Sequence, residues 1–131
     1  MAIARTAANV RPINCPPHTI VNDVPLNATV EAGELVYHDG TGWALAALTN
    51  ATTGAAQGVC LKSGAAGARV DVLTGPGRVT GWTGLTPGGK LYSAASGEVS
   101  HTTSAQYSGC VGWAISETDW FFTGQPPYTV P

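Results

Sequence analysis

The fold of this chain is decided by residues 34–46, which read ELVYHDGTGWALA. Two runs of strand-forming residues, 34–38 and 43–46, flank a short stretch that contains two glycines. An Asp-Gly pair between such runs is a strong signal for a β-hairpin, because glycine readily adopts the positive φ that tight turns need. The stretch therefore predicts a strand, a turn and a second strand.

Short strands and turns continue on both sides of this hairpin. About nine or ten strand-forming runs recur along the chain, separated by turn residues, and this spacing is typical of a β-sandwich or a β-barrel. Charged and apolar residues alternate over residues 69–72, which gives that strand one wet face and one buried face. We predict an all-β head, a small β-barrel or β-sandwich, over residues 20–123.

Both ends of the chain predict extended arms. Residues 1–19 carry neither a helical nor an alternating pattern and end near Pro16 and Pro17, and consecutive prolines impose extended backbone with few donors. Residues 124–131 hold three prolines, which keep this segment out of a central strand. We expect an extended N-terminal arm over 1–19 and an extended proline-rich C-terminal tail over 124–131, each lying on another surface.

The composition favours one domain and excludes several classes of partner. A length of 131 residues is typical of a single domain, and only 11% of the residues are charged. The net charge is -2 and the six Lys and Arg residues are scattered singly, so we expect no nucleic-acid partner. No apolar run has the length of a bilayer span or of a signal peptide, so we expect no membrane partner and no export by that route.

The three cysteines predict reduced thiols. Cys15, Cys60 and Cys110 are odd in number and far apart in sequence, which suits a protein made in the cytoplasm better than a disulfide framework. Free cysteines are mostly buried and behave as small hydrophobic residues. We expect all three to be packing residues.

The motifs that could carry chemistry are weak. Residues 84–91, GLTPGGKL, approach the phosphate-binding pattern G-x-x-x-x-G-K-[ST], but Leu91 replaces the hydroxyl that holds magnesium, and Lys90 opens a strand where a helix is needed. Cys15 and His18 form the only close Cys/His pair, whereas a zinc site needs four ligands. The scattered carboxylates leave a glycosidase pair open, with solvated loop charges as the simpler interpretation. We expect no enzyme and assign no catalytic, cofactor-binding or metal-binding residue.

The four tryptophans are the more informative residues. Core packing is the simpler interpretation for each of them, but tryptophan is also frequent at interfaces and on sugar-binding faces. Trp43 and Trp82 stand beside glycines near turns. These two are therefore the best candidates for a contact between subunits or a platform for a ligand.

A wider similarity starts at residue 30, with the stretch VEAGELVYHDGTGWALA. It is followed by GVCL at 58–61, VDVLTG at 70–75, GLTPGGKLYS at 84–93 and CVGWAIS at 110–116. In this order the pieces resemble the small capsid decoration (cement) proteins of tailed bacteriophages. The resemblance covers about residues 30–122.

This resemblance implies a structural function without catalytic residues. It implies a β-barrel or β-sandwich head on the outer surface of the virion capsid, commonly a homotrimer, with arms that reach over neighbouring coat subunits. The implied partners are the phage major capsid protein and further copies of the chain, after synthesis in the cytoplasm of the bacterial host. The alternative is a receptor- or carbohydrate-binding module of a phage fibre or spike, where the same β-modules occur, with Trp43 or Trp82 as its stacking platform.

The residues that we expect at capsid or subunit interfaces are apolar side chains of the two arms together with the two turn tryptophans. They are Ile3, Val10, Ile13, Trp43, Trp82, Pro126, Tyr128 and Val130. Deleting residues 1–14 is expected to abolish attachment to the shell and to leave the head folded.

Overall fold

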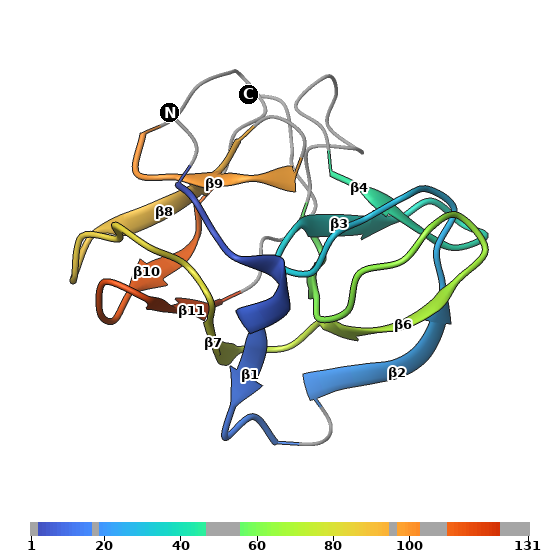
Figure 1. Cartoon of the computed structure of the whole chain (residues 1–131), viewed down its shortest axis with the longest axis horizontal. Helices are drawn as coiled ribbons and strands as arrows, with labels where there is room; N and C mark the ends of the chain where they lie inside the picture. The colour runs from blue at the N-terminus through green and yellow to red at the C-terminus, as the bar shows by residue number, and fades with distance from the viewer. Residues whose placement is uncertain (1–2, 17–18, 47–55, 95–96, 103–109, 124–131) are drawn as a thin grey trace.

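The computed structural model describes residues 3–16, 19–46, 56–94, 97–102 and 110–123, which form two antiparallel β-sheets (Figure 1). The six-stranded sheet has the order β1 (Arg11–Ile13), β7 (Gly77–Thr80), β11 (Asp119–Phe122), β10 (Cys110–Ala114), β8 (Lys90–Ser93) and β9 (Val99–Ser100). The five-stranded sheet has the order β2 (Ile20–Pro25), β6 (Arg69–Leu73), β5 (Gly58–Cys60), β3 (Leu35–His38) and β4 (Trp43–Leu45). One short 3-10 helix, η1 (Ala7–Asn9), precedes β1.

The prediction of an all-β head is confirmed, and its architecture is sandwich-like. The two sheets are not closed into a barrel, because each sheet keeps two edge strands among the described residues. The turn at Gly75 and Pro76 carries the chain from β6 in one sheet to β7 in the other. The consecutive strands β6 and β7 therefore belong to different sheets.

The predicted hairpin is present as β3 and β4, with residues 39–42 as its turn. Gly40 adopts φ +106°, a conformation that an L side chain rarely takes. The Asp39 carboxylate accepts hydrogen bonds from the Asn27 side chain and from the backbone N–H groups of Thr41 and Gly42. These bonds favour the ionised carboxylate and lower the pKa of Asp39 well below its ordinary value.

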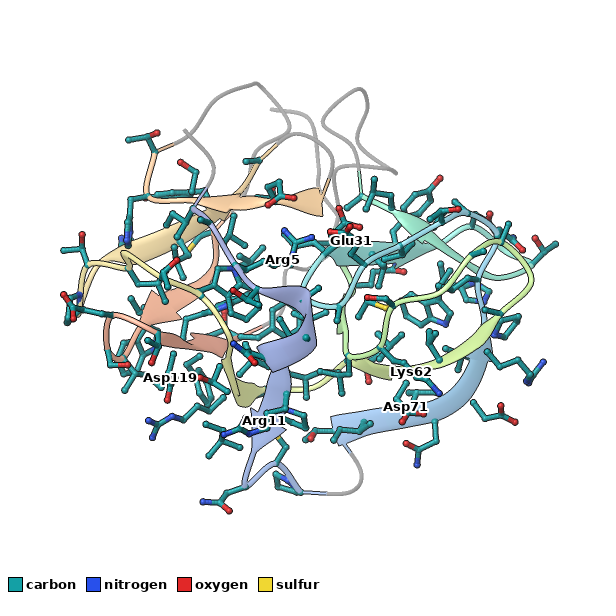
Figure 2. All side chains as sticks on the ribbon, in the orientation of Figure 1. Arg5, Arg11, Glu31, Lys62, Asp71 and Asp119 are labelled. Carbon is teal, nitrogen blue, oxygen red and sulfur yellow. The ribbon has the colours of Figure 1, made fainter. Side chains whose placement is uncertain are left out.

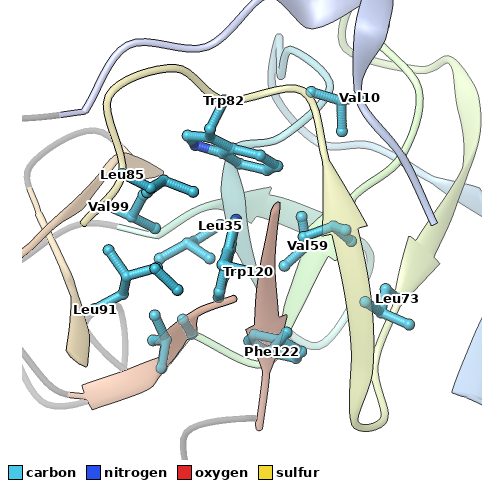
Figure 3. Packing of buried hydrophobic residues seen from close by; sticks show 14 of the residues in the cluster. Val10, Leu35, Val59, Leu73, Trp82, Leu85, Leu91, Val99, Trp120 and Phe122 are labelled. Atoms are coloured by element: carbon cyan, nitrogen blue, oxygen red, sulfur yellow. The ribbon is translucent and has the colours of Figure 1, made fainter. Parts of the chain in front are cut away.

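The main core lies between the sheets (Figure 3). Leu35 and Val59 from the five-stranded sheet meet Trp120 and Phe122 from the six-stranded sheet, and all four are fully buried. Trp82 packs edge to face on Trp120, with the ring centroids 5.5 Å apart. Aromatic pairs in this geometry add to the stabilisation from burial alone, so the two rings help to hold the sheets together.

The outer face of the five-stranded sheet is covered by a second, smaller core. Val36 and Val72 point away from the main core and pack beneath Leu26 and Val30, which belong to the connection between β2 and β3. Backbone hydrogen bonds fix this connection, since Leu26 N–H donates to the Ala68 carbonyl and Val30 N–H donates to the Gly64 carbonyl. The central strands of this sheet are therefore buried on both faces.

The described part of the predicted N-terminal arm lies on the head. Ile3 N–H donates to the Val99 carbonyl, and β1 pairs with β7 along its length. The Val10 side chain is 7% exposed and belongs to the main core. Because residues 3–16 contribute a strand and a core residue, the expectation that residues 1–14 can be deleted from a folded head is corrected.

Arg5 joins this N-terminal segment to both sheets through ion pairs. Its side chain is only 7% exposed, and its guanidinium lies 2.6 Å from a Glu98 carboxylate oxygen, 3.1 Å from Glu31 and 3.4 Å from Glu34. Burial raises the pKa of Glu34, and the positive charge of Arg5 partly opposes that effect. Gly33 has φ +94°, and a Cβ there would lie 2.6 Å from Arg5 Cδ, so only glycine fits beside the guanidinium stem.

Candidate docking face

One register row crosses the outer face of the six-stranded sheet. Lys90 on β8 pairs with Trp113 on β10, Trp113 with Phe121 on β11, Phe121 with Arg78 on β7, and Arg78 with Ile13 on β1. Because successive side chains of a strand point to opposite faces, these five share the face that is turned away from the main core. We call them the aromatic face. Their strand neighbours Leu91, Ala114, Trp120 and Val79 are fully buried on the other side.

The centre of the aromatic face is apolar and open to solvent. Trp113 is 45% exposed and packs beside Phe121, with ring centroids 6.2 Å apart and ring planes inclined at 39°. Strands in a sheet are about 4.8 Å apart, so the row from Lys90 to Ile13 spans about 19 Å. An exposed tryptophan of this kind is a typical anchor of an interface, because it buries a large area with little loss of conformational entropy.

Positive charge borders the two rings. The five strands that carry the aromatic face hold Arg11, Arg78 and Lys90 against a single carboxylate, Asp119, which gives them a net charge of +2. Arg78 donates to Asp119 from Nε at 3.0 Å and from Nη2 at 2.5 Å, and this pair is neutral as a unit. Arg11 and Lys90 are exposed and supply the excess charge.

Asp119 stays ionised within this pair. Burial alone would raise the pKa of Asp119, but hydrogen bonds from the side chains of Thr80, Arg78 and Thr118 outweigh burial and hold the pKa below its ordinary value. The carboxylate therefore fixes the Arg78 guanidinium at one end of the aromatic pair. The aromatic face therefore presents a positioned arginine in place of a freely rotating one.

A polar pocket of about 290 Å³ opens where the N-terminal segment meets β7. Arg11 and Thr80, which are paired across β1 and β7, connect it with the face that carries the row. Arg11 is its only ionisable side chain, so the pocket offers no acid and base pair. It is lined by Thr6, Asn9, Arg11, Thr80, Gly81, Trp82, Thr83 and Thr118.

A second exposed apolar side chain lies on the other sheet. Val21 on the edge strand β2 is 40% exposed, and it and Trp113 are the two large hydrophobic residues that the described part of the chain exposes. Asp23 follows it on the same strand with a side chain 76% exposed, and the Asp71 carboxylate accepts a hydrogen bond from Asp23 N–H. Arg69 offsets one of these charges at 3.0 Å from Asp23. Val21 pairs with Val72, so its side chain lies on the outer face of the five-stranded sheet, whereas Asp71 and Arg69 alternate to the other face.

The structure buries three of the residues expected at an interface. Val10 is 7% exposed, Trp43 is 9% exposed and Trp82 is 2% exposed, so none of them presents a side chain to a partner, and this expectation is corrected. Trp43 packs in the smaller core and meets His38 edge to face, because the hairpin turns its ring toward the sheet. Trp82 follows β7 into the main core.

The remaining expected interface residues have other positions. Ile13 is half-buried at the end of the aromatic face, and Ile3 is half-buried against the main core. Pro126, Tyr128 and Val130 lie outside the described residues, as does the predicted C-terminal tail.

The three cysteines are free thiols in different surroundings. Cys60 is buried in the smaller core, and burial raises the pKa of its thiol. Cys15 is half-buried, whereas Cys110 is exposed on β10. The expectation of a packing residue is therefore correct for Cys60 and wrong for Cys110.

Many of the ionisable residues form ion pairs or turn contacts. Within the described ranges no group of three or more His, Cys, Asp or Glu side chains is arranged to hold a metal ion. The phosphate-loop look-alike is a turn that leads into β8, and His101 holds it by accepting from Thr86 N–H through Nε2 and contacting the Lys90 carbonyl through Nδ1. That arrangement makes Nδ1 the protonated nitrogen.

Trp113, the exposed ring, was not among the residues predicted at an interface. A glycine neighbour does not distinguish Trp43 and Trp82 from it, because Gly112 precedes Trp113, and the informative signal is alternation along the last two strands. In β11 the buried Trp120 and Phe122 alternate with Phe121, and Trp113 is the residue of β10 that pairs with Phe121. Pairing the two runs as a hairpin about residues 115–118 would have placed both rings on the outer face.

Comparisons of this chain with protein-family models, with curated proteins and with solved structures gave no match. Among the described residues, no helix has the length and apolar character required to cross a bilayer.

Proposed function

We propose that this protein is a capsid decoration protein, which binds the outer surface of a tailed-phage head and bridges major capsid protein subunits. The observation that carries the proposal is the aromatic face. A protein that leaves Trp113 exposed beside the half-buried Phe121 on one sheet, and that covers the centre of the matching face of its other sheet, has a surface suited to another protein chain.

The order of the motif pieces supports the same proposal. Residues 30–46 contain the β3–β4 hairpin, 58–61 contain β5, 70–75 contain most of β6, 84–93 contain the turn and β8, and 110–116 contain β10. The resemblance therefore rests on segments from both sheets. A similarity that includes strands of both sheets is more specific than one confined to a single hairpin.

Such a protein stabilises the shell by binding to it and catalyses no reaction. Apolar surface that is removed from water stabilises a contact by about 25 cal/mol per Å², and a shell repeats each contact many times. A homotrimer that touches several coat subunits at once would raise the force needed to separate them. The proposal includes no catalytic activity.

Shells assembled from the major capsid protein of the same genome, without decoration, provide the test. Purified protein is expected to bind them to a fixed number of copies per shell and to raise the temperature at which they break. Shells saturated beforehand with unlabelled protein are the control and should take up no labelled protein. Folded protein that binds no better than an unrelated β-sandwich protein would contradict the proposal.

The alternative is a receptor- or carbohydrate-binding module of a phage fibre or spike. Trp43 and Trp82 are buried and provide no stacking platform, so Trp113 is the one tryptophan of the chain with a ring open to a sugar. Binding of the isolated protein to a glycan array, lost in Trp113→Ala and kept in Trp43→Phe, would favour this module over a decoration protein.

A further inference from the structure

Arg11 is the one arginine that has no carboxylate partner among the described residues. The other three, Arg5, Arg69 and Arg78, each form an ion pair. Figure 2 shows Arg5 beside Glu31, whereas Arg11 lies on β1, on a different part of the molecule. An exposed guanidinium of this kind leaves its N–H donors available to a partner from outside the chain.

The polar pocket beside this arginine is held open by backbone contacts. The N-terminal segment forms one wall and is joined to the residues after β7, because Thr6 N–H donates to the Gly81 carbonyl at 2.9 Å and Thr83 N–H donates to the Ala4 carbonyl at 3.0 Å. A Cβ at Gly81 would lie 2.8 Å from Val10 Cα, so glycine allows this close approach. The pocket therefore exists before a ligand binds, which lowers the entropic cost of binding.

The polar groups of the pocket match a carboxylate. Arg11 can donate two parallel N–H groups to the two carboxylate oxygens, and Thr6 and Asn9 add a hydroxyl and an amide that can donate. One guanidinium balances the single charge of a carboxylate. A phosphate group carries about -1.5 to -2 charges at neutral pH, more than this pocket can balance.

Asp119 already has other partners and leaves Arg11 available. Its carboxylate accepts from the hydroxyls of Thr80 and Thr118, which line the pocket, and it forms its ion pair with Arg78. The negative charge of Asp119 is therefore balanced by Arg78, and the acceptor that fits Arg11 comes from another molecule.

The pocket lies on the same side of the sheet as the aromatic face. Arg11 and Ile13 are two residues apart on β1, so their side chains share a face. A strand spacing of about 4.8 Å and a rise of about 3.4 Å per residue place Arg11 about 16 Å from Trp113. A standard interface covers about 800 Å² on each partner, which is wide enough to include both residues. A protein docked over Trp113 can therefore reach the pocket with one of its side chains.

We propose that this pocket binds an acidic side chain, Asp or Glu, of the protein that docks on the aromatic face. Its volume of about 290 Å³ is at the lower end of the range for ligand pockets, about 300–1,000 Å³, and suits a single side chain. Trp113 supplies the apolar contact, and Arg11 selects the partner, because a partner without the carboxylate leaves the guanidinium without an acceptor. The inference rests on the proposed function in taking the docking protein to be the major capsid protein.

The isolated protein tests the pocket without shells. Titration with N-acetylglutamate α-amide, followed through the amide NMR shifts, is expected to perturb Gly81 and Thr83 and to reach saturation. The control ligand is N-acetylglutamine α-amide, which has nearly the same shape and no charge. It should bind about tenfold more weakly or worse, because it cannot form the charge-assisted pair with Arg11.

Three variants separate the pocket from the general charge of the face. Arg11→Gln should weaken binding of the glutamate probe about tenfold or more, and Arg11→Lys should have an intermediate effect, since it keeps the charge and loses the paired donors. Lys90→Gln is the matched control. It removes one exposed positive charge from the aromatic face outside the pocket and should change the affinity by less than about twofold, because solvent and salt screen that charge. Unchanged thermal unfolding verifies that each variant is folded.

Undecorated shells test the occupant. Arg11→Gln should raise the dissociation constant for shells about tenfold or more, and Lys90→Gln should change it much less. One exposed carboxylate of the capsid protein, changed to its amide, should have the same effect as Arg11→Gln, and the two changes together should cost little more than either alone. This non-additivity would identify the acidic side chain that enters the pocket.

Several outcomes would overturn the inference. A glutamate probe that leaves the pocket unperturbed, a glutamine probe that binds equally well, or equal effects of Arg11→Gln and Lys90→Gln would each do so, and shell binding by the same protein would leave the proposed function standing. Glucuronate that binds about tenfold more tightly than the glutamate probe would assign the pocket to an acidic sugar and exclude a protein side chain as its occupant. Conversely, Arg11-dependent binding of the glutamate probe by a protein that ignores shells would keep the carboxylate site and remove the proposed function.

Discussion

The two sheets of this protein differ in what covers their outer faces. On the five-stranded sheet Leu26 and Val30 close over Val36 and Val72, and a second core results. On the six-stranded sheet the corresponding face presents Trp113 to solvent. The covered sheet buries most of its apolar side chains within the chain, and the bare sheet leaves Trp113 exposed. This difference makes the aromatic face the candidate docking surface of the protein.

The largest expected effect on stability comes from truncating Leu26, which packs over the outer face of the five-stranded sheet. Leu26→Ala should lower the free energy of unfolding by about 2–5 kcal/mol, because it leaves a cavity in a closed core. Phe121→Ala on the bare sheet should cost about 1 kcal/mol, the range of a cross-strand pair. Urea unfolding of the monomeric protein measures both, and equal losses would mean that the two outer faces do not differ.

Arg5 joins the N-terminal segment to both sheets through buried ion pairs, which can be compared with an exposed ion pair. Arg5→Met should destabilise the protein by about 3 kcal/mol, since it leaves Glu34 and Glu98 without their buried cation. Arg69→Met is the matched control: the Arg69 side chain is 57% exposed, and loss of its pair with Asp23 should cost under about 1 kcal/mol. Similar losses in the two variants would show that Arg5 is not a buried anchor.

Asp119 and Glu34 should respond to acid in opposite ways. The pKa of Asp119 is lowered in the folded protein, so its stabilisation is complete above the ordinary value of 3.8 and is lost as pH falls through the lowered pKa. The pKa of Glu34 is raised, so the stabilisation by its protonated form is complete below 4.5 and is lost as pH rises through the raised pKa.

Urea midpoints measured across the acid range test both signs. The urea midpoint of Asp119→Asn should fall less than that of the wild type at low pH. The urea midpoint of Glu34→Gln should fall less as the pH rises just above the ordinary glutamate pKa. A Glu34→Gln variant with the same profile as the wild type would contradict the second expectation.

The smallest expected effect is a difference in the rates at which the cysteines react. Cys110 is exposed on the bare sheet and should react quickly with a thiol reagent, whereas Cys60 is buried in the covered core and its raised pKa disfavours the thiolate. Binding to undecorated shells through the aromatic face should slow labelling of Cys110 in the wild type, and Trp113→Ser should restore the fast rate. Equal labelling rates for Cys60 and Cys110 would contradict the difference between the two outer faces.

Local chemistry explains which parts of the fold were predictable. The hairpin at residues 39–42 follows from an Asp-Gly turn, and residues 69–73 follow from alternation, because both signals lie within a few neighbouring residues. The sheet that each strand joins is not a local property, since β6 and β7 are consecutive in sequence and lie in different sheets.

The same reasoning explains what the sequence did not reveal about the candidate site. The N-terminal segment has no periodic pattern, and its place on the head depends on Arg5 meeting Glu98, which is 93 residues away. A separation of that size leaves no signal in a short window of sequence. Trp82 and Trp113 have similar local contexts, and only strand pairing distinguishes a buried ring from an exposed one.

The strand order of the six-stranded sheet makes its completion depend on a strand that comes late in the sequence. β11 contains residues 119–122 and lies between β7 and β10, so the last strand of the described part of the chain occupies an interior position of that sheet. Until β11 is inserted, β7 and β10 have no strand to join them, and the sheet consists of two unfinished halves. A chain that is cut before residue 119 therefore leaves a gap inside the sheet that no other described strand fills.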